Sequence, residues 1–148
     1  MITGGLGGLG LLTAEWLAEN GAPHLLLAGR SAPSSEATAH IAGLEARGVR
    51  VYVRRTDVSR AEEVAALWAD AGRDYPAIRG VLHLAGALDN GVLLQQNWSR
   101  FRNVLGAKVA GAWHLHNCTK NLETDFFVLY SSVAALLGSR PTALAMVP

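Results

Sequence analysis

The sequence has a single cysteine, Cys118, among its 148 residues, which excludes an internal disulfide framework. We interpret this thiol as a small apolar side chain on a helix rather than as a reactive group. Charges of both signs are mixed and the net charge is only +1, so the composition indicates no nucleic-acid or acidic-membrane partner. No apolar run reaches the ~18–20 residues that a membrane-spanning helix needs. Because Met1 leads directly into glycines rather than into a secretion leader, we expect a cytoplasmic protein.

Glycine, by contrast, is concentrated near the start of the chain. Five glycines fall within residues 4–10, after the short apolar stub Met1–Thr3 and before a predicted helix over 11–20. Glycine allows tight turns and close approach of the backbone to a ligand. Such a turn aims the N–H groups of a helix N-terminus at a diphosphate. The segment therefore predicts a nucleotide-binding loop, although a tight turn without a ligand is the simpler alternative.

The rest of the sequence alternates short apolar runs with helical patterns. Strands are predicted over residues 24–28, 49–56, 78–85 and 126–130, and further helices over 35–47, 60–72 and 97–120. Strands that alternate with helices of this length predict an α/β fold, with a doubly wound parallel sheet covered on both faces. No internal repeat or low-complexity linker is present, and half of the residues are apolar, so the chain is one domain or part of one.

Polar residues at the predicted helix starts indicate capping. Ser34 or Ser35 is the expected cap of the second helix. Ser59 followed by Glu62 fits a capping box for the third helix. Asn97 or Ser99 is expected to begin the long fourth helix.

Arg30 and Ser31 follow the second predicted strand, where ligands bind in an open parallel sheet. A site for NAD usually has an acidic residue at this point, to accept from the ribose hydroxyls. Arginine instead can bind a 2′-phosphate with its forked guanidinium, which favours NADP. The alternative is a solvated surface arginine.

The third and fourth strands also end in candidate residues. Asp57 and Val58 follow the third strand, where a carboxylate either accepts from the adenine amino group or caps the next helix. Ala85 and Gly86 stand at the end of the fourth strand, where small residues leave room for the nicotinamide ribose. His83 lies within that strand, and we interpret it as a packed core histidine rather than as a catalytic one.

Lys108 lies inside a mostly apolar helical segment, so its amine must reach water or a partner. It either extends to solvent or acts near an active site, where a charged amine can lower the pKa of an acid or hold a ribose hydroxyl. Ser131 and Ser132 end the fifth strand. A hydroxyl there can donate to a carbonyl, although isolated serines are more often caps.

Taken in order, these segments resemble the short-chain dehydrogenase/reductase superfamily, and more closely the ketoreductase domain of modular polyketide synthases. The glycine loop, Thr3-Gly4-Gly5-Leu6-Gly7-Gly8-Leu9-Gly10, fits two variants of the superfamily loop and does not choose between its branches. The resemblance rests on the later segments, which are Gly29-Arg30-Ser31, Asp57-Val58, Val81-Leu82-His83-Leu84-Ala85-Gly86, Lys108-Val109-Ala110-Gly111-Ala112-Trp113 and Phe126-Phe127-Val128-Leu129-Tyr130-Ser131-Ser132.

The resemblance implies a Rossmann-like, incomplete sheet of about five strands in the order 3-2-1-4-5. It also implies NADPH as cofactor and reduction of a β-ketoacyl thioester, held on an acyl carrier protein, to a β-hydroxyacyl thioester. Lys108 then matches the lysine that assists the catalytic tyrosine, and Ser132 matches the serine that orients the substrate carbonyl. Other synthase domains are possible partners. The cofactor contacts implied are Thr3, Gly4, Gly5, Leu6, Gly7, Gly8, Leu9, Gly10, Arg30, Ser31, Asp57, Val58, Ala85, Gly86 and Lys108, and no metal is implied.

The sequence departs from this family after residue 139. The family's general-acid tyrosine should stand 13 residues after Ser132, where this chain has Ala145, and its asparagine would fall at 149. No tyrosine follows Tyr130. We therefore expect weak or no reduction by this chain alone, and interpret residues 1–148 as one partial domain, frameshifted or truncated, that is the cofactor-binding half of a ketoreductase. Leu88-Asp89-Asn90 resembles a family motif linked to product stereochemistry, but it also fits a simple turn.

Two other classes remain as alternatives. A non-catalytic structural or interaction module of a megasynthase could lack the tyrosine in the same way. A methyltransferase would want an acidic residue where Arg30 stands, and an epimerase of the extended branch still needs a tyrosine followed by a lysine four residues later.

Overall fold

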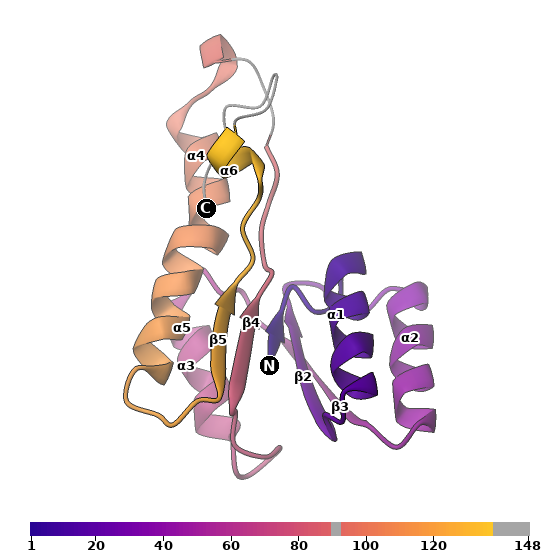
Figure 1. Ribbon diagram of the computed structural model, residues 1–148. Coiled ribbons are helices and arrows are strands. Elements are labelled where there is room, and N and C mark those ends of the chain that lie inside the picture. Colours follow the sequence, from indigo (N-terminus) through magenta and orange to yellow (C-terminus); the bar gives the residue numbers. More distant parts are fainter. Residues whose placement is uncertain (90–92, 138–148) are drawn as a thin grey trace.

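The chain forms one parallel β-sheet with helices on both faces (Figure 1). The computed structural model describes residues 1–89 and 93–137. The strands are β1 (Ile2–Thr3), β2 (His24–Gly29), β3 (Arg50–Arg55), β4 (Gly80–His83) and β5 (Phe126–Leu129). The helices are α1 (Gly8–Glu19), α2 (Ser35–Ala46), α3 (Ala61–Asp70), the 3₁₀ helix η1 (Leu93–Gln95), α4 (Trp98–Leu105), the π-helix η2 (Gly106–Ala110), α5 (Gly111–Thr119) and α6 (Ala134–Leu137).

The strand order is β3-β2-β1-β4-β5, and all neighbours are parallel, so the predicted fold class and order are confirmed. Central β1 is short, and its two residues pair with Leu27 and Ala28 on one side and with Leu82 and His83 on the other. The sheet order places the carboxyl ends of all five strands at one edge.

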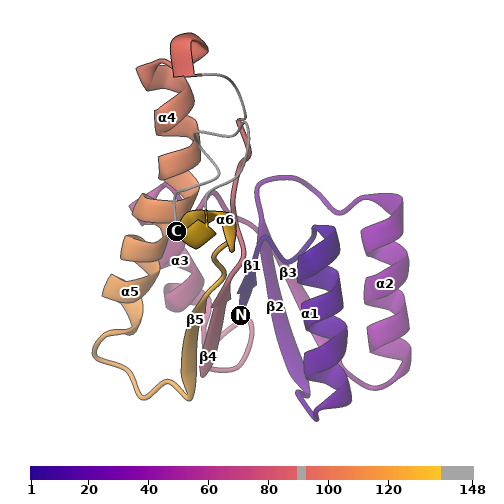
Figure 2. The same cartoon turned by 45° about the horizontal axis from the view of Figure 1, so that its top comes forward.

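Alternate residues of β2 divide the core into two layers, as the pleat of a strand requires. Leu25 and Leu27 face α1 and α2, whereas Leu26 and Ala28 face α3 and α5. Figure 2 shows the same arrangement, with α1 and α2 on one side of the sheet and α3 and α5 on the other. In the described ranges, no helix combines the length and the hydropathy needed to cross a membrane.

Two of the predicted helix starts are correct. The Ser34 side chain accepts from the N–H of Ala37 at 3.1 Å and caps α2, and the Asn97 side chain accepts from the N–H of Arg100 at 3.2 Å and caps α4. Gly48, with φ +87°, ends the turn after α2 in the left-handed conformation that glycine favours.

The predicted capping box of Ser59 and Glu62 is wrong. The helix begins at Ala61 after Arg60, and no side chain caps it. The Asp57 carboxylate accepts from the N–H and the hydroxyl of Ser59, at 3.0 and 2.8 Å, so this hydroxyl is already engaged as a donor. Glu63, rather than Glu62, reaches back to the N–H of Asp57, at 2.7 Å.

The predicted long helix over 97–120 is interrupted in its middle. Helices α4 and α5 join through the π-helix η2, and Lys108 lies in this π segment. A π segment has one extra residue in its turn, which the apolar periodicity of the sequence did not indicate. The predicted strand over 78–85 is also shorter in the structure. Strand β4 covers only Gly80–His83, because its pairing with β1 and β5 ends at His83. Asn90, Ala145 and the tail from 139 onward lie outside the described residues.

Candidate functional site

The glycine loop turns sharply from β1 into α1. Gly4 has φ +68°, in the left-handed region, and its carbonyl accepts from the N–H of Gly7 at 3.1 Å. A Cβ atom on Gly10 would lie 2.3 Å from the Gly4 carbonyl oxygen, so the first turn of α1 packs directly on the loop. A Cβ on Gly4 would lie 2.9 Å from the backbone nitrogen of Ala85. Glycine is therefore required at both positions.

The N-terminus of α1 is open to an anion. Its N-cap is Gly7, no side chain caps the helix, and its first turn carries no acidic residue. The first N–H groups of a helix have no acceptor within the helix, and they carry the positive end of its dipole. This combination fits the phosphate groups of a nucleotide.

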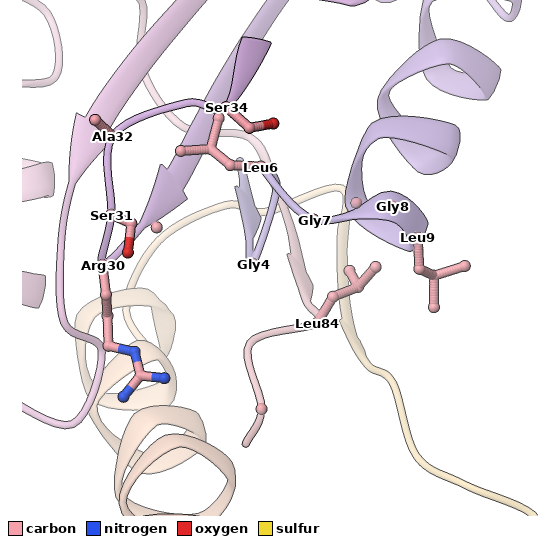
Figure 3. A pocket seen from close by; sticks show the side chains of 13 residues that line it. Gly4, Leu6, Gly7, Gly8, Leu9, Arg30, Ser31, Ala32, Ser34 and Leu84 are labelled. Atoms are coloured by element: carbon pink, nitrogen blue, oxygen red, sulfur yellow. The ribbon is translucent and has the colours of Figure 1, made fainter. Parts of the chain in front are cut away.

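A cavity of about 420 Å³ lies in front of this helix end (Figure 3). It brings together most of the glycine loop, the Arg30–Ser31 segment after β2, and Gly86 after β4. Figure 3 shows Arg30 and Ser31 at the end of β2, across from the loop. The lining residues are Gly4, Leu6, Gly7, Gly8, Leu9, Gly10, Gly29, Arg30, Ser31, Ala32, Ser34, Leu84 and Gly86.

Four of these lining residues, Gly29, Ala32, Ser34 and Leu84, are not among the predicted cofactor contacts. Ser34 was recognised only as the cap of α2, although a segment that leaves β2 and enters α2 must cross the same edge of the sheet. Other predicted residues, Thr3, Gly5, Asp57, Val58, Ala85, Lys108 and Ser132, do not line this cavity. Thr3 and Gly5 are buried beneath the loop.

Asp57 and Val58 lie at the carboxyl end of β3. Burial opposes ionisation of Asp57, but its hydrogen bonds from Ser59 and the charges of Arg30 and Arg60 outweigh this, so its pKa is lowered. The carboxylate is thus a stable anion at neutral pH and holds the turn before α3. Val58 is buried, and its carbonyl accepts from His114 Nδ1 at 3.0 Å.

Lys108 approaches the cavity from η2. A Cβ atom on Gly86 would lie 3.6 Å from Lys108 Cε, so the lysine side chain passes beside the end of β4. Gly4, Ala85, Gly86 and Lys108 are therefore close together, although they come from three separate parts of the sequence.

Ser132 follows the carboxyl end of β5. Its hydroxyl oxygen accepts from the N–H of Ala134 at 3.2 Å, which is the capping role that its sequence context left open. The N–H of Tyr130 donates to the carbonyl of His83 at 3.0 Å and keeps this end of β5 beside β4. Across residues 1–89 and 93–137, no cluster of three His, Cys, Asp or Glu side chains is placed to hold a metal.

The sheet order defines a Rossmann-like α/β fold, and comparison with known proteins gives the family. The KR domain family model matches residues 1–144. The chain belongs to the KR (ketoreductase) domain family of polyketide synthases, whose members are short-chain oxidoreductases that generally use NADPH.

Among curated relatives, the chain is 42% identical over 142 residues to a phenolphthiocerol/phthiocerol polyketide synthase of Mycobacterium tuberculosis, covering 94% of this chain and 6% of that protein. It is 40% identical over 151 residues to the 6-methylsalicylic acid synthase of Penicillium expansum, covering 93% of this chain and 8% of the synthase. The chain therefore spans only a small part of these multidomain proteins.

Among solved structures, the ketoreductase domain from the bacillaene assembly line matches with a TM-score of 0.92 at 33% identity, over 99% of this chain and 35% of that chain. A-type ketoreductases from a modular polyketide synthase match with a TM-score of 0.90 at 38% identity, over 99% of this chain and 31% of that chain. The described fold thus corresponds to about a third of each of these structures.

Proposed function

We propose that this chain is the NADPH-binding part of a polyketide-synthase ketoreductase. The observation that carries the proposal is the cavity that joins the open N-terminus of α1, Arg30 with Ser31, and Gly86. The required absence of side chains at Gly4 and Gly10 supports it, since a Cβ atom at either position would disrupt the loop. These features fit a dinucleotide that carries an additional phosphate.

Each group of the cofactor has a suitable partner among the described residues. The N–H groups at the start of α1 fit the diphosphate, and Arg30 with Ser31 fits the 2′-phosphate. Asp57 is an anion that can accept from the adenine amino group. Ala85 and Gly86 leave space for the nicotinamide ribose beside Lys108.

The reaction of the parent domain would convert a β-ketoacyl thioester on an acyl carrier protein to a β-hydroxyacyl thioester. When bound, the cofactor would supply the hydride for the ketone carbon, and the ketone oxygen would have to gain a proton. The Ser132 hydroxyl would donate to that oxygen, and the Lys108 ammonium would hold the ribose and favour ionisation of the proton donor.

The resemblance to the family calls for a proton donor that residues 1–148 do not supply. The sequence has no tyrosine after Tyr130, and Ala145 stands at the family position. A general acid typically accelerates such a reaction by ~10²–10⁴-fold. We therefore expect this chain to bind NADPH without efficient turnover. Interactions with a carrier protein and with other synthase domains belong to the same proposal.

A second candidate is a non-catalytic structural module of a synthase. It is favoured by the same absence of a tyrosine after Tyr130. The two candidates differ in cofactor binding. A structural module has no need of NADPH, whereas the ketoreductase part must bind it.

The test compares the affinities for NADPH and NADH of the chain, of Arg30→Ala and of Arg47→Ala. Arg47 is the control because it is an exposed arginine paired with Glu15 and Glu19, away from the cavity. Loss of a charge-assisted contact to the 2′-phosphate should weaken NADPH binding by about 10–100-fold in Arg30→Ala and leave NADH binding unchanged. A folded chain that does not bind NADPH would favour the structural module.

A further inference from the structure

His83 uses both nitrogens of its buried imidazole ring. Its Nε2 lies 3.0 Å from the carbonyl oxygen of Ala107, and its Nδ1 lies 2.6 Å from the hydroxyl oxygen of Thr3. A carbonyl can only accept, so Nε2 carries the proton and donates. Nδ1 of the neutral ring is then an acceptor, and the Thr3 hydroxyl donates to it. The Thr3 oxygen in turn accepts from the N–H of Ala85 at 3.3 Å.

The carbonyl of Ala107 lies in the π-helix, where the regular pattern of helical hydrogen bonds changes. In an α-helix the N–H of Gly111 would donate to Ala107, four residues earlier. Here it donates to the carbonyl of Gly106, five residues earlier. The His83 N–H therefore donates to this partly buried carbonyl in place of the Gly111 N–H, which the π turn directs to Gly106.

The surroundings of His83 keep the ring neutral and fixed. Burial, together with the nearby charge of Lys108, lowers its pKa, although the bond to Ala107 partly opposes this. A Cβ atom on Gly111 would lie 3.3 Å from His83 Cε1, so the start of α5 packs against the ring. The neutral form with its proton on Nε2 is thus the one that this site favours at neutral pH.

We infer that His83 is a positioning residue that fixes the π segment, and with it Lys108, relative to the glycine loop. The chain of hydrogen bonds runs from Ala85 through Thr3 and His83 to Ala107, the residue next to Lys108. It joins β1, the end of β4 and η2, which are the three elements that bring Gly4, Gly86 and Lys108 together. What Lys108 does there rests on the proposed function, but the positioning does not.

A histidine that only fills space in the core would behave differently. An apolar side chain of similar size could replace such a residue without moving its neighbours. In the arrangement described here, replacement of the ring by leucine leaves the Ala107 carbonyl and the Thr3 hydroxyl without these partners, and the π segment loses its link to β4.

The lysine content of the chain provides a direct readout. Lys108 and Lys120 are the only two lysines in the sequence, so a chain labelled with ¹³C at the lysine Cε gives two signals. Lys120 follows α5 and bonds to Asn117, which makes it an internal control. The experiment records both signals in the full chain, in His83→Leu and in His83→Gln, each with and without NADPH.

We expect His83→Leu to shift or broaden the Lys108 signal and to leave the Lys120 signal unchanged. Glutamine can still donate to the Ala107 carbonyl, so His83→Gln should restore the Lys108 signal in part. NADPH should shift the Lys108 signal of the unmodified chain, and His83→Leu should weaken binding about tenfold. An unchanged Lys108 signal in a folded His83→Leu chain would overturn the inference.

A failure of the proposed function would give a different result from a failure of the positioning role of His83. If the unmodified chain does not bind NADPH, the proposed function fails, while the effect of His83→Leu on the free chain still tests the positioning. Thr3→Val removes the hydroxyl without touching His83 and should disturb the Lys108 signal, unlike Thr3→Ser. Thr119→Val, which removes another buried hydroxyl, is the matched control.

The ring itself can be measured in the unmodified chain, which keeps the inference testable if the His83 variants do not fold. Nitrogen-15 spectra distinguish the two neutral forms of a histidine ring. We expect the proton of His83 on Nε2 at neutral pH. A proton on Nδ1, or a charged ring at neutral pH, would overturn the inference, because the hydrogen-bond chain could not then run as described.

Discussion

Gly10 and Gly43 are both helical residues, but their surroundings differ. A Cβ on Gly10 would lie 2.3 Å from the Gly4 carbonyl, whereas a Cβ on Gly43 would have nothing within 4 Å. Gly10→Ala should therefore destabilise the fold by about 3 kcal/mol, since backbone must move to make room. Gly43→Ala should stabilise it by about 0.5–1 kcal/mol through helix propensity. Urea unfolding measures both, and equal effects of the two substitutions would contradict the packing described for the loop.

The amine of Met1 predicts a dependence of stability on pH. The amine is buried and donates to the carbonyl of Gly80 at 2.7 Å, and burial lowers its pKa from 8.0 to about 6. The unfolded chain then binds this proton more tightly than the folded chain, so stability falls as the pH is lowered from about 8 to about 6. The loss is about 2 kcal/mol, or roughly 4–8 °C in Tm.

The control for this prediction is a chain acetylated at Met1. Acetylation removes the titrating group and should flatten the profile from about pH 8 down to the range where histidine titrates. His83, whose pKa is also lowered, should contribute only below its ordinary value of 6.5. A step of the same size in the acetylated chain would show that another group is responsible.

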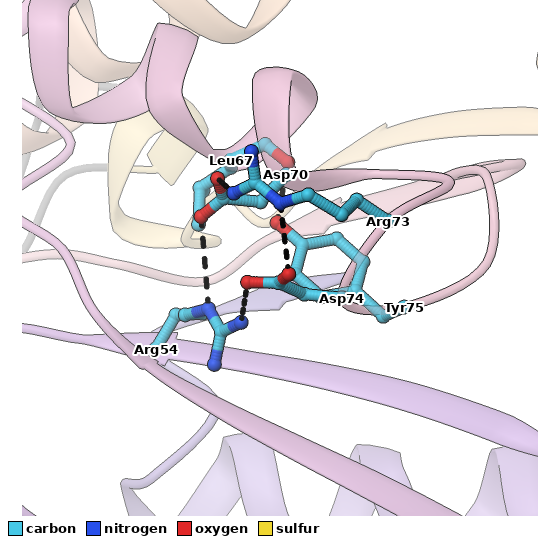
Figure 4. A network of polar contacts seen from close by, with 6 residues as sticks. All are labelled: Arg54, Leu67, Asp70, Arg73, Asp74 and Tyr75. Atoms are coloured by element: carbon cyan, nitrogen blue, oxygen red, sulfur yellow. Dashed lines mark hydrogen bonds and ion pairs between the residues drawn. The ribbon is translucent and has the colours of Figure 1, made fainter.

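At the scale of elements, the loop between α3 and β4 is held to α3 by a buried hydroxyl, and to β3 by contacts of Arg54 (Figure 4). The Tyr75 hydroxyl donates to the carbonyl of Leu67 at the end of α3, and the Arg54 guanidinium lies 5.2 Å from the Tyr75 ring centre. Arg54 also pairs with Asp74 at 2.9 Å, and Arg73 pairs with Asp74 at 3.0 Å.

These contacts should differ in their contributions to stability. Tyr75→Phe leaves the buried Leu67 carbonyl without this donor and should cost about 1–2 kcal/mol. Arg73→Ala removes the exposed ion pairs with Asp70 and Asp74 and should change stability by no more than about 0.5 kcal/mol. Denaturant midpoints of the two variants measure the difference. A larger loss in Arg73→Ala than in Tyr75→Phe would reverse this assignment.

The helices show which structural features the sequence patterns could predict and which they could not. Local signals, such as Ser34 and Asn97 before apolar periodicity, predicted the starts of α2 and α4 correctly. The capping box failed because the helix begins one residue later than predicted, with Arg60 as its N-cap, and Glu63 rather than Glu62 reaches back to the turn after β3. The π segment was missed because the contacts around it, such as the close packing of Gly111 on Val58 and His83, join residues that are far apart in the sequence.

At the scale of the whole molecule, the outer strand β5 is apolar but poorly covered. Within the described residues it pairs with β4 alone, and Phe126, Val128 and Leu129 are each exposed by 40% or more. Interior strands of parallel sheets are normally buried on both faces, and an exposed apolar edge favours aggregation. We therefore expect marginal stability, with a Tm below about 60 °C.

Two valines on paired strands test this expectation. Val128→Lys places a charge on the exposed edge and should reduce aggregation with little change in Tm. Val81→Lys places the same charge on β4, where the side chain is fully buried, and should prevent folding. Light scattering and thermal unfolding measure both effects. A cooperative transition above about 60 °C in the unmodified chain would contradict the expected marginal stability.

The sheet order could be predicted because the alternation of strands and helices, with the resemblance to ketoreductases, leaves few topologies. The composition of the site was only partly predictable. The glycine loop, Arg30 and Gly86 share one cavity as their positions at strand ends suggested, whereas Ser34 and Leu84 have no sequence signal for a ligand. The role of His83 is visible only through partners that are far apart in the sequence.

The central claim is that NADPH binds at the N-terminus of α1. The most direct measurement is the backbone amide spectrum of the folded chain during titration with NADPH, with NADH as the control. We predict saturable shifts of the Gly8, Leu9, Gly10 and Ser31 amides, stronger with NADPH, while Gly43 and Gly48 remain unchanged. A well-folded spectrum that NADPH leaves unaltered, or shifts confined to other parts of the chain, would contradict the claim.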